Sequence, residues 1–175
     1  MCKRIDSVVS MEVDSTRWRQ LQELSSVKGR QAPKAVVVAL ASVAGDSDTD
    51  RMAVWPSMAT TASTTTWSCW IVTERSLGHV RIEYEKYLYD LGDEAVWELA
   101  PSDWSAWVRP IANVIGFRFG PFYPAHRQAT IFEPAERVVV TFPDGDVNIP
   151  DGPVPVDQRA NLGRIIEALR AAVNF

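Results

Sequence analysis

Histidine and cysteine are scarce in this chain, whose 175 residues include two of each. Cys2 and Cys69 lie far apart and neither belongs to a C-x-x-C pair, so the sequence lacks the ligand spacing of a zinc site. It also lacks a Gly-x-Ser-x-Gly elbow, a glycine-rich phosphate loop and a His-Glu-x-x-His motif. The sequence therefore predicts no metal, no cofactor and no catalytic residues.

Long hydrophobic runs are missing as well. The longest apolar stretch, residues 35–41, is too short to cross a bilayer. No apolar core follows the opening Met-Cys-Lys-Arg-Ile-Asp, so we expect no secretory signal. These two absences favour an intracellular, cytoplasmic protein.

Basic charge is not concentrated anywhere, and the net charge is −4. Residues 1–30 carry six basic and four acidic side chains, residues 31–100 five and ten, and residues 101–175 seven and eight. A surface that binds phosphate backbones or anionic headgroups needs a cluster of Lys and Arg. Neither nucleic acid nor anionic membrane lipid is therefore expected as a partner.

Tryptophan, by contrast, is abundant, with seven residues. Five of them fall in one region: Trp67, Trp70, Trp97, Trp104 and Trp107. The Trp side chain combines a large apolar area with one N–H donor, so such a cluster builds either a core or an exposed binding surface. We favour the core.

Alternation of apolar and polar residues predicts short antiparallel strands across this region. Residues 67–80 read as two strands joined by a turn at residues 74–77. Further strands are predicted at residues 80–84, 95–99, 115–119, 129–132, 137–142 and 146–149. Pro143-Asp-Gly145 is a tight-turn signal, and Pro110 excludes its segment from a central sheet position.

Residues 34–43 are nearly all apolar and β-branched, which predicts one more, buried strand. Residues 59–66 read as a loop or an extended edge strand. A short N-terminal helix can be capped by Asp14 or Ser15 and stopped by Gly29. Its apolar residues are Trp18, Leu21, Leu24 and Val27.

The C-terminal helix is predicted at residues 157–173, with Asp157 as its cap. One face of this helix carries Leu162, Ile165, Ile166, Leu169 and Val173. The predicted fold class is α+β, mainly β: a small, partly open antiparallel barrel or sandwich closed by this helix. We divide the chain into an N-terminal lead-in with the short helix, residues 1–33, and a β-barrel domain, residues 34–175.

Three short motifs resemble those of bacterial pleckstrin-homology-like (PH-like) or GRAM-like domains. They are Trp70-Ile-Val-Thr-Glu-Arg-Ser-Leu77, Pro110-Ile-Ala-Asn-Val114 and Phe142-Pro-Asp-Gly145. The resemblance covers residues 34–175 and implies a partly open barrel that binds phosphoinositide headgroups or proteins. Lipid-binding members carry Lys and Arg in the first strand-connecting loop. Here that loop carries Asp46, Asp48 and Asp50, which repel phosphate, so protein recognition remains.

These three aspartates also alternate as at the start of an EF-hand loop. The sixth and twelfth positions of that loop require Gly and Glu, and here they hold Arg51 and Ser57. A solvated acidic loop is therefore the favoured interpretation. His79 follows a glycine at the start of a strand, which predicts a surface or turn histidine rather than a general base.

Residues 117–127 mix aromatic residues, Pro and Arg, the composition of binding hot spots. The candidate partner-binding residues are Phe117, Phe119, Phe122, Tyr123, His126 and Arg127. The alternative interpretation is a structured loop that covers a barrel end. Residues 81–89 are a second candidate, an exposed strand edge that could accept a partner strand, although its charges could equally prevent such pairing.

Three functions stay open on this basis. The favoured one is a non-enzymatic intracellular binding module that recognises a protein partner. A structural, self-assembling subunit with a Trp-rich face is the second. The third is a small-ligand-binding protein or enzyme with a pocket near Tyr123, His126 and Arg127.

Overall fold

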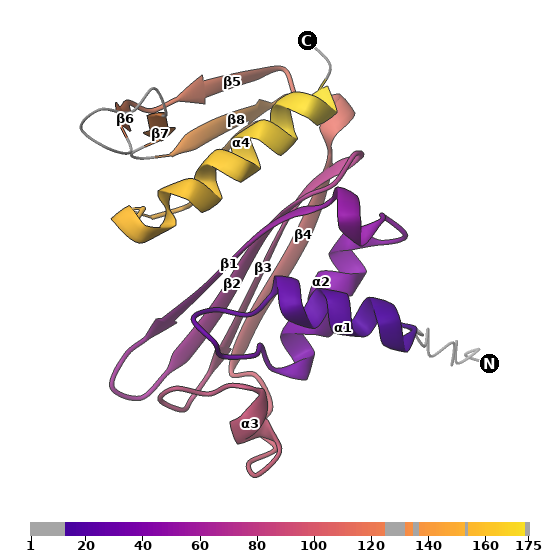
Figure 1. The fold of residues 1–175 in the computed structure, drawn as a ribbon, viewed down its shortest axis with the longest axis vertical. Helices are drawn as coiled ribbons and strands as arrows, with labels where there is room; N and C mark the ends of the chain where they lie inside the picture. Colours follow the sequence, from indigo (N-terminus) through magenta and orange to yellow (C-terminus); the bar gives the residue numbers. More distant parts are fainter. Residues whose placement is uncertain (1–12, 125–131, 135–136, 153, 174–175) are drawn as a thin grey trace, which may run out of the picture.

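The computed structural model describes residues 13–124, 132–134, 137–152 and 154–173, with the backbone alone at 122–124 and 132–134. A long four-stranded antiparallel sheet occupies the middle of the fold, with two helices on one face (Figure 1). The C-terminal helix and a three-stranded sheet cover the upper part of the other face. The fold is α+β, as predicted, but its sheets do not close into a barrel within the described residues.

The four-stranded sheet is a meander in which each strand pairs with the next. Its strands are β1 (Ala53–Thr60), β2 (Thr65–Val72), β3 (Ser76–Tyr84) and β4 (Asp103–Pro110), in that order. The β2–β3 hairpin confirms the predicted alternation, and its turn lies one residue earlier than predicted, at residues 73–76. The predicted strand edge at residues 81–89 is wrong, because β3 has β2 on one side and β4 on the other.

Two helices, α1 (Ser15–Leu24) and α2 (Lys34–Ala44), pack on one face of this sheet. Asp14 caps α1, its side chain accepting bonds from two backbone N–H groups. The predicted strand at residues 34–43 is wrong, since this segment is α2. Periodicity cannot distinguish a strand from a helix in a run that is apolar almost throughout, and the four alanines of α2 favour the helix.

A second antiparallel sheet contains β5 (Gly116–Phe119), β8 (Val138–Phe142) and β9 (Gly145–Ile149), in the order β5-β8-β9. The β8–β9 hairpin confirms the predicted strands, and Gly145 has the positive φ, 139°, that its turn requires. A ribbon of β6 (Phe122–Pro124) and β7 (Phe132–Pro134) replaces part of the predicted aromatic loop. Strand pairing is possible there because each proline is the last residue of its strand.

The C-terminal helix α4 (Arg159–Val173) forms as its periodicity predicts. Four of its apolar residues are buried, namely Leu162, Ile165, Ile166 and Leu169. The 3-10 turn η3 (Val156–Gln158) leads directly into α4, so Asp157 lies inside that turn instead of capping the helix.

Buried side chains form two apolar clusters, one on each face of the four-stranded sheet. The first cluster lies under α1 and α2 and includes Trp67 and Ile71 of β2. The second joins the opposite face to α4 and the three-stranded sheet, and it includes Trp70 and Val72 of β2. Successive side chains of a strand point to opposite faces, so β2 serves both clusters.

The segment between β3 and β4 contains the short helix α3 (Leu91–Glu94), which Asp90 caps. The predicted strand at residues 95–99 does not form: the chain turns after α3 and has no regular structure at residues 97–100. Tyr89 anchors this segment to the sheet, since its carbonyl accepts a 2.9 Å bond from the Trp67 indole. Two further 3-10 turns, η1 (Thr49–Arg51) and η2 (Ile111–Asn113), flank the four-stranded sheet in sequence.

Candidate functional site

Two of the predicted binding residues, Phe117 and Phe119, lie side by side on β5. Their ring centroids are 6.1 Å apart. Phe117 packs against the second apolar cluster, and the Arg170 guanidinium of α4 lies 5.0 Å from the centroid of the Phe119 ring. Both aromatic rings therefore help to join the three-stranded sheet to its surroundings.

The side chains of the other four predicted binding residues lie outside the described part of the structure. Phe122 and Tyr123 belong to β6, for which only the backbone is described. His126 and Arg127 lie outside the described residues. The predicted pocket near Tyr123, His126 and Arg127 therefore stays a prediction.

His79 is buried, with 6% of its surface exposed, so its predicted position at the surface is wrong. Its ring stacks on Trp70, with centroids 4.2 Å apart, and lies 6.1 Å from the ring of Trp107. Its Nε2 atom is 2.7 Å from the hydroxyl of Ser68. Burial lowers the pKa of His79, partly opposed by the charge of Asp151. Trp107 belongs to β4, which pairs with β3 in the sheet but lies far from His79 in the sequence. The residues next to His79 in sequence therefore give no sign that its side chain is buried.

A serine hydroxyl bonded to a neutral imidazole is also half of a nucleophile–base system. Catalysis by such a pair needs a third group that orients the imidazole and a space in which the reacting atom can sit. The rings of Trp70 and Trp107 occupy the surroundings of the imidazole, and the His79 side chain is closed to a substrate. We therefore interpret Ser68 and His79 as a polar pair within the core.

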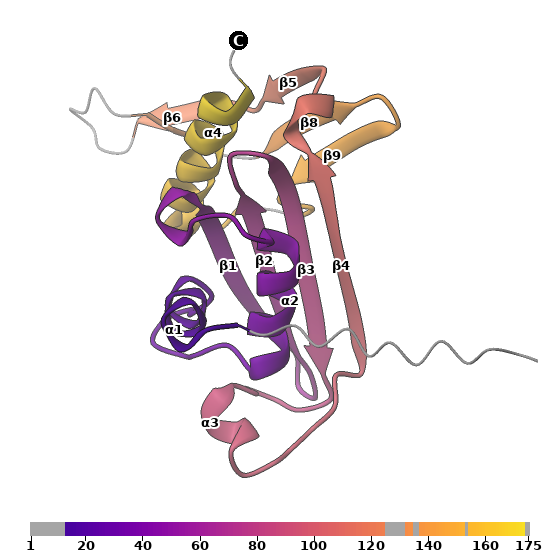
Figure 2. The same ribbon diagram turned by 90° about the vertical axis from the view of Figure 1, so that its right-hand side faces the viewer.

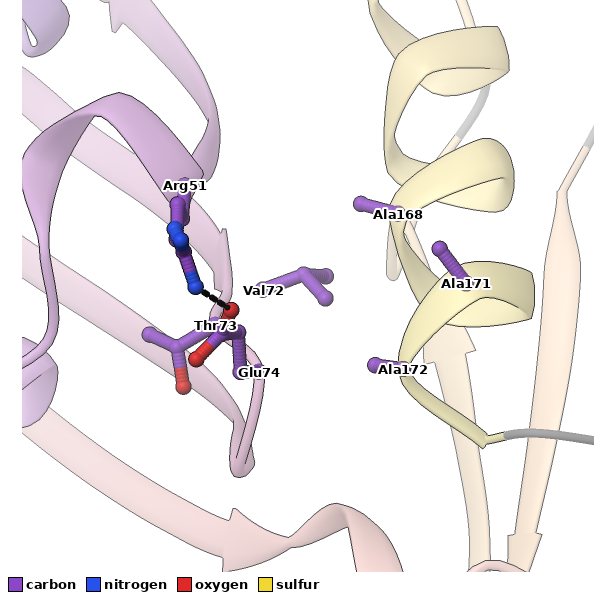
Figure 3. Close-up of a pocket in the computed structure, with 7 residues that line it drawn as sticks. All are labelled: Arg51, Val72, Thr73, Glu74, Ala168, Ala171 and Ala172. Atoms are coloured by element: carbon purple, nitrogen blue, oxygen red, sulfur yellow. Dashed lines mark hydrogen bonds and ion pairs between the residues drawn. The ribbon is translucent and has the colours of Figure 1, made fainter.

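A cavity of about 380 Å³ lies between the β2–β3 turn and the last turns of α4 (Figure 3). It is lined by Arg51, Val72, Thr73, Glu74, Ala168, Ala171 and Ala172. Figure 3 shows the three alanine methyl groups facing Val72 across the cavity, and their short side chains keep the space open. Arg51 and Glu74 pair with each other at 2.7 Å, which leaves little polar capacity to orient a ligand.

The acidic loop lines another cavity, of about 530 Å³. This loop follows helix α2, so it is not the strand-connecting loop that the PH-like resemblance implies. Asp48 accepts a 3.0 Å bond from the backbone N–H of Asp50 and thereby caps η1. Within the described residues, no three His, Cys, Asp or Glu side chains are placed to hold a metal ion.

Strand β4 carries apolar side chains that the fold leaves uncovered. Trp104 and Val108 are 67% and 52% exposed, and Ala106 between them is exposed too. The three side chains point to the same side because strand side chains alternate. We call Trp104, Ala106 and Val108 the β4 surface. Exposed apolar residues that follow one another in this way are typical of interaction sites.

The backbone of β4 is also open on one side, because β3 is its sole strand neighbour among the described residues (Figure 2). Just beyond the Ser76–Pro110 pair, the N–H of Ile111 donates a 2.9 Å bond to the carbonyl of Arg75. Hydrogen-bonded pairs alternate along an antiparallel ladder. The odd-numbered residues of β4 therefore bond to β3, and the even-numbered ones direct N–H and C=O outward. Pro110, which has no N–H, fits this outward position.

The opposite edge of the sheet, β1, is protected. Pro56 lies in the middle of β1 and removes a donor, and a strand proline is tolerated where its nitrogen faces away from the neighbouring strand. Both α1 and α4 contact β1. Of the two sheet edges, β4 thus offers the longer free row of donors and acceptors.

Sequence reasoning missed the β4 surface because Trp104 and Val108 look like core residues. Only the strand order shows that they lie on an edge strand, where the helices leave both side chains exposed. One signal was available: Pro110 predicts that its segment is not central, and β4 is an edge strand that ends at Pro110. Of the five clustered Trp residues, the predicted core position is confirmed for Trp67 and Trp70, Trp107 packs partly buried against the second apolar cluster, and Trp97 and Trp104 are exposed.

No helix in the described part of the chain is long and apolar enough to span a membrane. In comparisons with known proteins, the chain matches no family model, no curated protein and no solved structure.

Proposed function

We propose that this chain is a non-enzymatic binding module that recognises a protein partner through the outer edge of β4. The observation that carries this proposal is that one strand combines an unpaired backbone edge with the exposed β4 surface. Strand addition uses both features: main-chain hydrogen bonds supply affinity, and side chains at alternate positions supply specificity. Trp104 is of the residue type that contributes most to interfaces.

The resemblance to PH-like and GRAM-like domains supports the same class of function, since such domains serve mainly as binding modules. Two antiparallel sheets followed by a C-terminal helix are compatible with that relationship. We keep the aromatic region of residues 117–127 as a second proposed contact surface, and the cytoplasm as the proposed location. The β4 edge is favoured over the aromatic region because Phe117 already packs against the second apolar cluster and the Arg170 guanidinium lies over the Phe119 ring.

Site-specific photo-crosslinking tests this function. A photo-reactive residue, Val108→benzoylphenylalanine, is placed on the β4 surface, and the same residue at Val156, which is 72% exposed on η3, is the matched control. In a lysate of the source organism, we expect protein adducts from position 108 and far fewer from position 156. Equal labelling at both positions, or no adduct at position 108, would contradict the proposal.

A further inference from the structure

We propose that the partner of the β4 edge is a second copy of this chain, paired antiparallel about a two-fold axis at Ala106. This inference rests on the proposed function and names its partner. In this register Ala106 lies opposite Ala106 of the other copy, and Trp104 lies opposite Val108. The two four-stranded sheets then continue into one another across the axis.

The outward hydrogen-bonding groups fit this register. Residues 104, 106 and 108 direct their N–H and C=O groups away from β3, as the Ile111–Arg75 bond requires. The register pairs even-numbered residues with even-numbered residues, so each outward donor meets an outward acceptor. Pro110 falls beyond the last of these pairs, where its missing N–H interrupts nothing.

The side chains of β4 are complementary to themselves in the same register. On one face, Trp104 packs beside Val108 of the other copy, which covers both exposed side chains. On the opposite face, Asp103 lies opposite Arg109. Inside one chain Asp103 already pairs with Arg81 and Arg109 pairs with Asp144, each at 2.8 Å. Self-pairing therefore forms a row of four charges of alternating sign on each side of the axis. Each row consists of Arg81 and Asp103 of one copy followed by Arg109 and Asp144 of the other copy.

Neighbouring registers lose this complementarity. Two adjacent registers also pair the outward N–H and C=O groups of the two strands. A shift of one copy along the other in one direction places Pro110 opposite Trp104, and a shift in the other direction places Asp103 opposite Trp107. Neither brings Asp103 to Arg109. The acidic start and basic end of β4 match each other only when two copies run antiparallel about Ala106, and this is why we assign the edge to a second copy.

Charge reversal with mixing tests the assignment. Sedimentation of the full chain over roughly 1 to 200 μM should show a monomer–dimer equilibrium. Asp103→Arg alone, or Arg109→Asp alone, sets like charges opposite each other twice per dimer and should weaken self-association at least about tenfold. An equimolar mixture of the two variants should associate more tightly than either variant alone, because each reversed residue then faces the opposite sign across the axis.

Mixing is the control for misfolding, since a folding defect in one variant is not repaired by the other. A wild-type chain that stays monomeric overturns the inference, and so does a mixture no tighter than the separate variants. If a monomeric wild-type chain still yields adducts to another protein from position 108, self-pairing fails and the proposed function stands.

A disulfide test measures the register directly in a Cys2→Ser background. Ala106→Cys should crosslink two copies under mild oxidation, because hydrogen-bonded pairs have Cα atoms about 5.5 Å apart, within disulfide reach. Val108→Cys alone should not, because its opposite residue is Trp104. Cys69 does not compete: it is fully buried, and burial raises its pKa to about 12. Crosslinking through Val108→Cys but not Ala106→Cys overturns the register.

Discussion

Tyr84 and Tyr89 share the first apolar cluster, with ring centroids 4.4 Å apart, yet their hydroxyl groups differ. The Tyr89 hydroxyl donates to the carbonyl of Trp97 at 2.8 Å and accepts from the N–H of Leu99 at 3.3 Å. The Tyr84 hydroxyl is buried and has no hydrogen-bond partner among the described residues. Burial, the largest cause, raises the pKa of Tyr84.

Removing each hydroxyl should therefore have a different effect on stability. Tyr84→Phe should leave the free energy of unfolding unchanged or raise it, because an unpaired buried hydroxyl only adds a desolvation cost. Tyr89→Phe should lower it by about 0.5–1.5 kcal/mol, because the Tyr89 hydroxyl makes two hydrogen bonds to the backbone. Urea denaturation of both variants measures the difference, and a larger loss from Tyr84→Phe would show that its hydroxyl is bonded.

Stability should also depend on His79 below neutral pH. Its pKa in the folded chain lies below the ordinary value of 6.5, mainly because of burial, so the unfolded chain takes up the proton first. The stabilisation is complete above the unfolded pKa and is lost as the pH falls from about 6.5 toward the folded value. Chemical denaturation at about pH 7.5 and about pH 5.5 should show a steeper loss for wild type than for His79→Gln. Equal pH dependence of the two chains would refute a buried neutral imidazole.

At the scale of elements, α2 approaches the sheet closely at Gly78. A Cβ atom added to Gly78 would overlap the side chain of Val43 and lie 3.1 Å from the carbonyl oxygen of Trp107. Gly78→Ala should therefore lower the free energy of unfolding by about 1–3 kcal/mol, as overpacking does. The same substitution in a Val43→Ala background should cost less, since the overlapping atoms are gone. Equal costs in both backgrounds would mean that α2 does not set the requirement for glycine.

Elements with a clear alternation of apolar and polar residues are predictable from this sequence, and an element that is apolar on nearly every face is not. In β3, apolar Val80 and Ile82 alternate with charged Arg81 and Glu83, so both the strand and its inner face can be inferred. Residues 34–44 carry no such contrast, because apolar residues occupy the exposed side of the helix as well: Val38 is 43% exposed. Residues 59–66, which the sequence predicts as a loop or an extended edge strand, hold the end of β1, a turn and the start of β2, and the rest of β1 is not predicted.

The β4 surface could not be predicted, for a reason that lies in the order of the strands. The alternation within β4 indicates a strand with two different faces, but not how far the helices extend over it. Likewise, the burial of His79 depends on Trp70 and Trp107, which belong to two neighbouring strands. Edge position and cross-strand covering are properties of the assembled sheet, and no local pattern encodes them.

At the scale of the whole molecule, the two apolar clusters share β2 and β3. Trp67 reports on the first cluster, and Trp55 and Trp70 report on the second. Both clusters need β2 and β3 in place, and loss of either cluster exposes one face of these strands. We therefore expect both clusters to unfold in one transition. Tryptophan fluorescence and far-UV circular dichroism should give the same denaturation midpoint. Two separate midpoints would indicate that the clusters unfold independently.

The end of β2 next to the β2–β3 turn is buried on both faces, at Trp70, Ile71 and Val72. A strand displaced there by one residue would exchange one buried apolar side chain for another, which gives little discrimination between correct and shifted pairing. In the first half of β2, the hydroxyl of Thr66 bonds to the Glu83 side chain of β3, and the hydroxyl of Ser68 bonds to the His79 side chain of β3. These polar pairs sit on one face alone, so a misaligned hairpin would lose them. The polar pairs therefore help to fix the register of the hairpin at the end far from its turn.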